Sequence, residues 1–376
     1  MKRWISVLVW LFLPSFFMNA QDTFELNLDE ETARPNIGGD GVFQESEGKL
    51  YYLNRISNNI KVFDLVSGNT LSTIPLFKAG PNKVGPQVET FFVLNKDSIF
   101  VFSEFFKNQV SLINSEGQVI NQYATWPKEI ESKYLGQQLS KKGGGIQVSM
   151  PYVYLSHFIY YLDTRQSFSS ITKVDIRNGE VSFVDRVPKT GEFIDNSKIA
   201  ILSSLLSPTI QMAADSRLIV NYPVSNDVFS FYEKKKGFDT HKAKSTTIEA
   251  IRLMTESLND MGREQYEREI RVVSSLSGYY SNLFYDKFKN KFYRIVRIPY
   301  NEEVLMTYRQ GILSKLPPYP FSIIELDENL NILSEWMDEK RVLQPERGVF
   351  VDERGLWVLE LRAKDEDKMI FHKVKF

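Results

Sequence analysis

Residues 60–74 read IKVFDLVSGNTLSTI, and this stretch decides the fold class. An apolar strand runs to Asp64, a tight turn follows at Ser67 and Gly68, and a second apolar strand comes after the turn. Such turn residues adopt the positive φ of a short chain reversal at low steric cost. The stretch therefore predicts a β-hairpin.

Three other stretches have the same form. They are VSLINSEGQVINQY at 110–123, ITKVDIRNGEVSFV at 171–184 and FSIIELDENLNILSEW at 321–336. Their turns fall at Glu116 and Gly117, Asn178 and Gly179, and Glu328 and Asn329, and their first strands end at Asn114, Asp175 and Glu325. From Asp64 onward these polar residues are separated by 50, 61 and 150 residues, and the last interval is the length of about three repeat units. A period in this range is typical of a solenoid or a propeller.

The remaining sequence completes the repeat. Strand-rich stretches fill residues 216–237 and 279–298, and a sixth unit lies at 347–376. Strands such as KLYYL at 49–53 and SIFVFS at 98–103 are apolar on both faces, as sheets stacked between neighbours must be. The sequence thus predicts an all-β fold, a six-bladed β-propeller that forms a single domain over residues 21–376.

The two ends of the chain are expected to close the ring. TFELNL at 23–28 alternates apolar and polar residues, and MIFHKVKF at 369–376 has a strand-like pattern up to the last residue. Pairing of these two segments in one blade would remove exposed strand edges, which otherwise invite aggregation. We therefore predict that the termini share a blade.

One segment departs from the strand pattern, at about 245–273. Apolar residues recur there at spacings of three and four, which predicts an amphipathic helical insertion. Thr246 and Glu249 have the form of a capping box at its start. The helix could be a lid over the propeller mouth, a partner-binding helix, or an insertion packed on a blade edge.

The N-terminal residues 1–20 have the pattern of a signal peptide. Lys2 and Arg3 precede an apolar run from Trp4 to Met18, and small polar residues follow up to Ala20. The run is 15 residues long, whereas a membrane-spanning helix needs about 20, although an uncleaved anchor stays open. The chain has no cysteine, so we expect no lipid anchor, disulfide or thiolate metal site. The expected location is periplasmic or extracellular, after signal peptide cleavage.

Charge and loop patterns argue against two classes of partner. The net charge is −1, and the basic runs at 140–145 and 233–237 are short, so no nucleic acid is expected to bind. AGPNKVGPQVE at 79–89 has the glycine spacing of a phosphate loop. However, Pro86 and Gln87 stand where that loop needs lysine and a hydroxyl residue. The segment is better interpreted as a connection between two blades.

The same connection carries a family resemblance. KAGPNKVGP at 78–86, followed by FFVLNKDSIFVFS at 91–103, resembles the inter-blade signature of TolB-like six-bladed propellers secreted by Bacteroidetes-type bacteria. YYSNLFYDKFKNKFYRIVR at 279–297 resembles a Tyr-Asp turn followed by Tyr-Arg in one such family of unknown function. The resemblance spans most of the chain and implies a propeller without any established activity or catalytic residues. Many of these relatives are lipoproteins, and this chain departs from that pattern because it has no cysteine.

Motifs for catalysis are missing from the sequence. The three histidines, His157, His241 and His372, are far apart, and no nucleophile elbow, zinc-protease or EF-hand motif is present. We interpret His157 as a core residue, and we place His241 in a polar linker and His372 in the closing strand. We therefore assign no catalytic residues and expect no metal and no cofactor.

The candidate ligand-binding residues are clustered in one stretch. They are Tyr279, Tyr280, Tyr285, Asp286 and Arg294. The cluster combines flat aromatic surfaces, which could stack on sugar rings, with a carboxylate and a guanidinium. The structural alternative is a Tyr-Asp turn with Arg294 in a blade-to-blade ion pair. Gly143 to Gly145 and LSKLPPYP at 313–320 have the composition of mouth loops.

Two functions remain open from the sequence. The first is a non-catalytic binding or scaffold protein of the cell envelope, a monomer that engages a glycan, peptide or envelope protein partner at one propeller mouth. The second is a propeller hydrolase or lyase that acts on a glycan or lactone through carboxylate residues. The low histidine content and the missing motifs favour the first.

Overall fold

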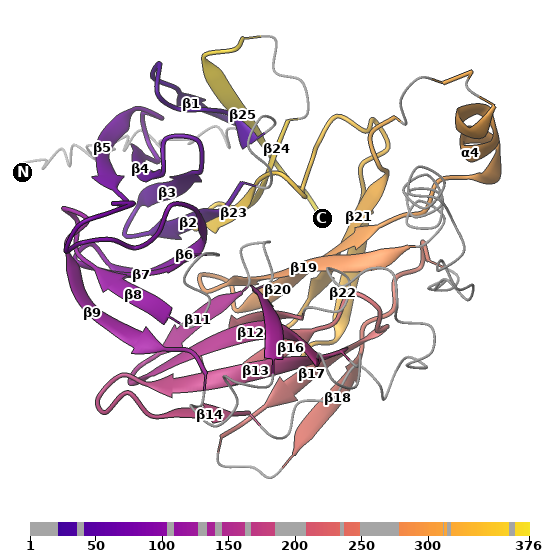
Figure 1. Ribbon diagram of the computed structural model, residues 1–376. Coiled ribbons are helices and arrows are strands. Elements are labelled where there is room, and N and C mark those ends of the chain that lie inside the picture. Colours follow the sequence, from indigo (N-terminus) through magenta and orange to yellow (C-terminus); the bar gives the residue numbers. More distant parts are fainter. Residues whose placement is uncertain are drawn as a thin grey trace, which may run out of the picture.

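The strands of the protein form six sheets around a common axis (Figure 1). The computed structural model describes residues 22–35, 41–103, 109–126, 134–139, 145–161, 167–184, 208–233, 237–248, 278–310, 312–313, 317–360 and 365–376. Every strand pairing between the named strands of a sheet is antiparallel. The predicted all-β, six-bladed β-propeller is confirmed.

The first three blades follow the chain from the axis outward. Blade 1 comprises β2 (Phe43–Ser46), β3 (Lys49–Asn54), β4 (Asn59–Asp64) and β5 (Thr70–Pro75). Blade 2 comprises β6 (Val88–Asn95), β7 (Ser98–Ser103), β8 (Gln109–Ile113) and β9 (Val119–Ala124). Blade 3 comprises β11 (Ile146–Ser149), β12 (Tyr152–Tyr161), β13 (Ser167–Asp175) and β14 (Val181–Phe183), and β10 (Tyr134–Leu139) pairs with the second half of β12.

The last three blades complete the ring. Blade 4 comprises β15 (Thr209–Met212), β16 (Leu218–Asn221), β17 (Asp227–Phe231) and β18 (Phe238–Lys242). Blade 5 comprises β19 (Tyr279–Asp286), β20 (Lys291–Arg297), β21 (Phe321–Leu326) and β22 (Ile332–Met337). Blade 6 comprises β23 (Val349–Asp352), β24 (Gly355–Leu359), β25 (Lys368–Lys373) and β1 (Thr23–Asn27). The innermost strands β2, β6, β11, β15, β19 and β23 contact one another in that order, and β23 contacts β2.

The two ends of the chain meet in blade 6. The N-terminal strand β1 pairs with the C-terminal strand β25, in a register that runs from Thr23 opposite His372 to Asn27 opposite Lys368. Figure 1 shows the two strands side by side although they come from opposite ends of the sequence. The predicted closure is confirmed, and its backbone hydrogen bonds tie the N-terminal strand to the C-terminal strand within blade 6.

The core lies between the blades. At the boundary of blades 6 and 1, Leu26 and Phe371 pack with Leu50 and Phe63, and all four side chains are inaccessible to solvent. Burial of each such side chain contributes about 1.5–3 kcal/mol to stability. Strands such as β3 are buried on both faces for this reason, which confirms the interpretation of the two-faced apolar strands.

The outer hairpins show the predicted turns, with one correction. Gly68, Gly117 and Gly179 have φ values of 71°, 76° and 74°. In the fourth hairpin the positive φ belongs to Leu330, at 66°, and not to the predicted pair Glu328 and Asn329. The polar residue that caps this turn is Asp327, which accepts hydrogen bonds from the backbone of Asn329 and Asn331.

The prediction that Glu325 ends the first strand of the fourth hairpin was therefore wrong. Glu325 lies within β21 and forms an ion pair of 2.9 Å with Lys291 on β20. Two acidic residues, Glu325 and Asp327, stand two positions apart near the end of the strand, so the sequence pattern alone does not distinguish them. Backbone hydrogen bonds in the turn decide which of them is the cap.

A helix that the sequence analysis missed lies between β20 and β21. It is α4 (Glu302–Arg309), and its N-cap Asn301 accepts a hydrogen bond of 2.9 Å from the backbone N–H of Val304. The predicted insertion at 245–273 lies outside the described residues, except for its first four, in which Ile248 is buried in the core. Among the described residues no helix is long and apolar enough to cross a membrane.

Candidate functional site

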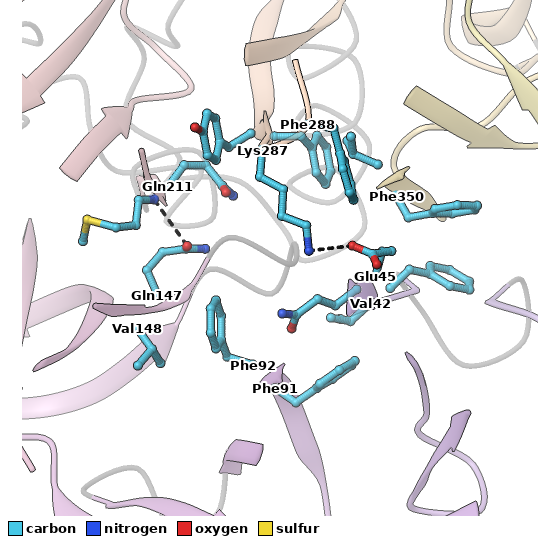
Figure 2. A pocket seen from close by; sticks show the side chains of 16 residues that line it. Val42, Glu45, Phe91, Phe92, Gln147, Val148, Gln211, Lys287, Phe288 and Phe350 are labelled. Carbon is cyan, nitrogen blue, oxygen red and sulfur yellow. Dashed lines mark hydrogen bonds and ion pairs between the residues drawn. The ribbon is translucent and has the colours of Figure 1, made fainter. Parts of the chain in front are cut away.

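A cavity of about 310 Å³ lies on the axis of the ring, and we call it the axial cavity. Its walls come from the innermost strands of all six blades and from the loops next to them (Figure 2). Phe284 and Tyr285 stand at the end of β19, and Lys287 and Phe288 lie in the turn that follows. The cavity therefore lies toward the face that carries the turns between the first and second strands of the blades.

The lining of the axial cavity is largely aromatic and aliphatic. Its aromatic residues are Phe43, Phe91, Phe92, Phe284, Tyr285, Phe288 and Phe350. Its aliphatic residues are Val42, Val148, Met212 and Val351. Phe288 is 45% exposed, so its ring stands at the rim and is available to a ligand. A concave apolar surface of this volume is typical of a ligand pocket.

Three glutamines contribute polar groups to the lining. Gln44 of β2 donates a hydrogen bond to the carbonyl of Val93 and accepts one from its N–H, at 2.9 and 2.8 Å. Gln147 of β11 accepts one of 3.3 Å from the N–H of Met212 (Figure 2). These two residues hold neighbouring innermost strands together. The side chain of Gln211 makes no hydrogen bond within the described part of the chain, so its amide can reach a ligand.

One ion pair joins two blades at the cavity. The Nζ atom of Lys287 lies 2.8 Å from the carboxylate of Glu45. Figure 2 shows the Lys287 side chain reaching from the turn after β19 in blade 5 toward Glu45 of blade 1. The side chain of Glu45 is 6% exposed and that of Lys287 is 53% exposed. Glu45 also accepts a hydrogen bond of 3.0 Å from the backbone N–H of Gly48. The carboxylate is thus held on two sides.

Of the five predicted site residues, Tyr285 lines the axial cavity. Its hydroxyl donates a hydrogen bond of 2.9 Å to Asn290 and accepts one of 3.1 Å from the N–H of Ala214. Burial raises the pKa of Tyr285 above its ordinary value. The ring is therefore a fixed, neutral wall of the cavity near neutral pH.

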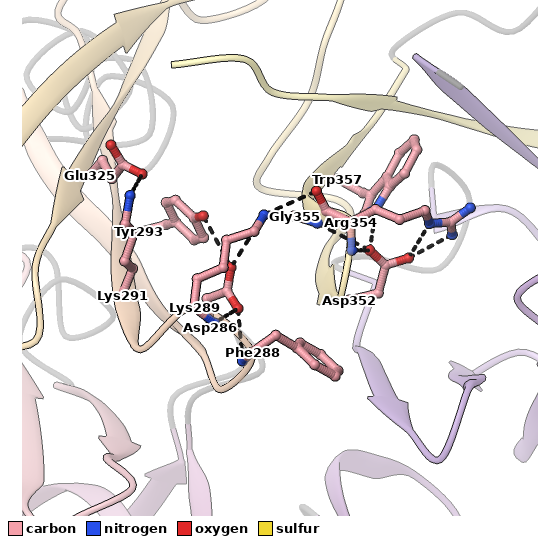
Figure 3. Close-up of polar contacts among 10 residues, drawn as sticks. All are labelled: Asp286, Phe288, Lys289, Lys291, Tyr293, Glu325, Asp352, Arg354, Gly355 and Trp357. Atoms are coloured by element: carbon pink, nitrogen blue, oxygen red, sulfur yellow. Dashed lines mark hydrogen bonds and ion pairs between the residues drawn. The ribbon is translucent and has the colours of Figure 1, made fainter. Parts of the chain in front are cut away.

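Asp286 organises the turn after β19 (Figure 3). Its side chain is fully buried, and one carboxylate oxygen accepts hydrogen bonds from the N–H groups of Phe288 and Lys289, both at 3.0 Å. The other oxygen accepts one of 3.2 Å from the Tyr293 hydroxyl. The Tyr-Asp turn of the structural alternative is therefore present, and it sets the position of Phe288 at the rim.

Arg294 and Tyr280 lie at the boundary of blades 4 and 5, away from the axial cavity. Arg294 is fully buried and donates hydrogen bonds of 2.6 to 3.2 Å to Asn221 and to four backbone carbonyls. Among the described residues its hydrogen-bond partners are neutral oxygens. Hydrogen bonds to these oxygens join blades 4 and 5, in place of the expected blade-to-blade ion pair. Burial lowers its pKa to about 9, so it stays charged at neutral pH.

Tyr279 stands at the opposite end of β19 from Tyr285. Its hydroxyl accepts a hydrogen bond of 2.7 Å from Arg297 and donates one of 3.0 Å to Glu346. The five predicted residues are thus spread over three places: the axial cavity with its adjoining turn, the boundary of blades 4 and 5, and the far end of β19.

The histidines occupy three separate strands. His157 is fully buried in β12 beside Thr172, at 2.6 Å, and burial lowers its pKa to about 3. His241 lies in β18 and not in a polar linker, because its stretch pairs with β17. His372 lies in β25, as predicted, 2.8 Å from Glu360. Within the described ranges, no group of acidic residues and histidines could hold a metal ion.

The sequence analysis missed the polar residues of the axial cavity. Gln44, Gln147 and Gln211 each lie in the first strand of a blade, after an apolar residue. This recurrence could have identified the three glutamines from the sequence once the six repeat units were aligned. Lys287 and Glu45 carry no such signal, because the pair forms only when the ring brings blade 5 toward blade 1.

Comparisons with known proteins agree with this architecture. The model of a domain of unknown function, DUF4221, matches residues 14–336. The chain belongs to the DUF4221 family. A search of curated proteins finds no significant match. The predicted membership of a propeller family of unknown function is thereby confirmed.

Solved structures extend the comparison. A DUF4221 member from Bacteroides vulgatus is 20% identical, with 94% of this chain and 96% of that chain covered and a TM-score of 0.69. A Bacteroides fragilis protein, named as a candidate for export, is 12% identical, with 94% of each chain covered and a TM-score of 0.52. At these identities the likeness shows the fold that this DUF4221 chain shares with them.

Proposed function

We propose that this DUF4221 protein is a non-catalytic binding protein of the cell envelope that takes an apolar side chain of a peptide or protein partner into its axial cavity. The observation that carries the proposal is the cavity of about 310 Å³, whose rim presents the exposed ring of Phe288. Apolar walls with a few placed polar groups are the usual composition of a binding pocket. Aromatic anchors also dominate the energy of many protein interfaces.

The polar groups of the lining suit a peptide backbone. Gln211 offers both a donor and an acceptor, and a peptide bond needs one of each. A sugar would place several hydroxyls against the phenylalanines and valines of the wall, and each unpaired hydroxyl would cost free energy on binding. The lining therefore favours a peptide over a glycan.

The carboxylates that line the axial cavity favour binding over hydrolysis. Glycoside hydrolysis uses a pair of carboxylates on either side of the bond that is cleaved. The described lining of the axial cavity contains a single carboxylate, Glu45, and it is engaged by Lys287 and by the backbone of Gly48. This arrangement supports a binding role.

The envelope location rests on the N-terminal sequence. Residues 1–20 have the charged start, apolar run and small residues of a signal peptide. We expect the protein isolated from the periplasm or the medium to begin near Gln21. Mass spectrometry of the intact protein measures this, and a species that keeps residues 1–20 would contradict cleavage.

Parallel peptide and glycan arrays test the proposed ligand class. We expect peptides with apolar or aromatic residues to bind, and Phe288→Ala and Gln211→Leu to weaken that binding by about 5-fold to 30-fold, because each removes one contact worth about 1–2 kcal/mol. Phe77→Ala is the matched control, since Phe77 is 39% exposed but lies outside the cavity. Binding of glycans without binding of any peptide would contradict a peptide ligand. Turnover of an array substrate would contradict the non-catalytic role.

A further inference from the structure

Two charged side chains line the axial cavity in the described part of the chain, Glu45 and Lys287. They differ in accessibility, because the Glu45 side chain is 6% exposed and that of Lys287 is 53% exposed. Each carboxylate oxygen of Glu45 already has a contact. One accepts a hydrogen bond from the N–H of Gly48, and the other lies 2.8 Å from the Lys287 ammonium. A ligand that enters the cavity therefore meets the positive group of this pair.

The Lys287 ammonium can serve a second acceptor. An ammonium group carries three N–H donors. Within the described ranges it is paired with Glu45, and it stands over the ring of Phe288, whose centre lies 5.0 Å from Nζ. Figure 2 shows the Lys287 side chain extending among the side chains of the lining. Since Glu45 takes one donor, others remain for a ligand.

The turn that carries Lys287 is held before and after this residue. Asp286 is fully buried and accepts hydrogen bonds from the N–H groups of Phe288 and Lys289. The Lys289 ammonium donates a hydrogen bond of 3.0 Å to the backbone carbonyl of Arg354 in blade 6 (Figure 3). A backbone that is fixed before the ligand arrives lowers the entropic cost of binding. The turn therefore presents the ammonium and the Phe288 ring together.

The axial cavity has room for one apolar side chain and its adjoining main chain. Its volume of about 310 Å³ is about twice the roughly 150 Å³ that accommodates a benzene ring. Its walls come from all six blades and surround the axis (Figure 2). An internal residue of a peptide would need its main chain both to enter and to leave this space. A terminal residue needs one passage only, so the geometry favours a chain end.

The charge at the rim distinguishes the two ends of a peptide. Near neutral pH a C-terminal residue carries a carboxylate, and an N-terminal residue carries an ammonium. The exposed member of the ion pair, Lys287, attracts the first and repels the second. A ligand ammonium would have to displace Lys287 to reach Glu45, because the Glu45 side chain is nearly inaccessible to solvent. The charges therefore favour the C-terminus.

We propose that the axial cavity binds the C-terminal residue of a peptide or protein, with its apolar side chain among the phenylalanines and its carboxylate on Lys287. This inference rests on the proposed function and specifies which part of the partner is bound. Gln211 belongs to the same lining and offers a donor and an acceptor to the last peptide bond. Apolar walls beside the ammonium lower the local dielectric and strengthen its attraction for a carboxylate.

Isothermal titration calorimetry of the full chain with one tripeptide in two forms tests the proposal. The tripeptide consists of two alanines and a C-terminal phenylalanine, and it is prepared as the free acid and as the amide. We expect the acid to bind about 5-fold to 10-fold more tightly, because the amide lacks the charge that Lys287 recognises. The difference should shrink in 1 M salt, which reduces the screening length to about 3 Å.

Three variants assign the effect to one side chain. Lys287→Gln should remove the preference for the acid or reverse it, since Glu45 then repels the ligand carboxylate. Glu45→Gln keeps the ammonium and an acceptor for Gly48, so it should increase the preference. Lys96→Gln is the matched control. Lys96 is 69% exposed in the turn after β6 and lies outside the lining, and its replacement should leave both affinities unchanged.

Four results would overturn the proposal. Equal affinity for acid and amide would remove the role of the terminal carboxylate and leave peptide binding in place. A preference for the acid that persists in Lys287→Gln would place the carboxylate elsewhere. Phenylacetate that binds as tightly as the tripeptide acid would make the ligand a small apolar acid. If neither form binds, array peptides that bind through internal residues would overturn this inference alone, whereas failure of every peptide would also overturn the proposed function.

Discussion

The guanidinium carbon of Arg294 lies 3.5 Å from the centre of the Tyr280 ring, with both side chains fully buried between blades 4 and 5. The Tyr280 hydroxyl donates a hydrogen bond of 2.9 Å to Asn226, and the guanidinium donates to the carbonyl of the same residue. A buried cation over an aromatic face is stabilised by the ring's quadrupole. The two residues join blade 5 to blade 4 through one loop.

Replacement of Arg294 should destabilise the protein. Arg294→Met leaves several buried carbonyl oxygens without donors, and we expect the free energy of unfolding to fall by about 3 kcal/mol or more. Urea denaturation measures the change. Arg177→Ala is the control, because Arg177 is 65% exposed and its replacement should leave the urea midpoint nearly unchanged. A normal midpoint together with lost ligand binding would instead support the predicted ligand-binding role of Arg294.

Removal of the C-terminal strand should open the ring. Deletion of residues 369–376 removes most of β25, which pairs with both β1 and β24, and it exposes the edges of two strands. We expect a large fall in the unfolding midpoint and aggregation in size-exclusion chromatography. A deletion mutant that unfolds at the parent midpoint would refute the role of the closure.

Two glycines with the same backbone conformation should differ in their tolerance of alanine. Gly68 has φ 71°, and a Cβ there would lie 2.0 Å from the carbonyl oxygen of Glu25 in β1. Gly48 has φ 72° with nothing within 4 Å. We expect Gly48→Ala to cost about 1 kcal/mol from backbone strain alone and Gly68→Ala to cost about 3 kcal/mol. If both variants lose the same unfolding free energy, the contact between position 68 and β1 adjusts at little cost. Thermal unfolding measures both losses.

Stability should fall as the pH is lowered through the histidine range. The folded-state pKa of His157 is about 3 because of burial, against an ordinary value of 6.5. Below about pH 6.5 the unfolded chain therefore binds a proton that the folded chain does not, and stability falls by up to about 1.4 kcal/mol per pH unit. The window between about pH 6.5 and 4.5 lies above most carboxylate pKa values. Burial also lowers the pKa of His241, so His241 contributes to the slope in the same direction.

A glutamine at position 157 tests the assignment, because its amide can still bond to Thr172 but does not titrate. We expect the slope of unfolding free energy against pH to flatten in His157→Gln across that window. The matched variant is His372→Gln, at a half-buried histidine of the closing strand. An unchanged slope in His157→Gln would assign the pH dependence to other groups.

The candidate site was less predictable than the fold, and particular residues show why. Tyr285 was singled out from sequence and lines the axial cavity, but Gln211 of blade 4 and Glu45 of blade 1 were not. These residues are 166 positions apart in the chain, and only the closed ring places them around one cavity. In the sequence, Arg294 has the aromatic neighbours and the charge that a ligand site would have. In the structure it is buried between two blades, where it donates hydrogen bonds to backbone carbonyls and is not exposed to a ligand.

The amino-acid sequence by itself determined the four hairpins, the strands that are apolar on both faces and the strand pattern of the two ends, since turn residues and strand periodicity act between neighbours in the chain. The structure corrected two local assignments, the Asp327 cap of the fourth hairpin and the place of His241 in β18. Only the tertiary structure decided which polar side chains share the axial cavity. That grouping depends on contacts between distant segments, and its free energy exists only after the blades have assembled around the axis.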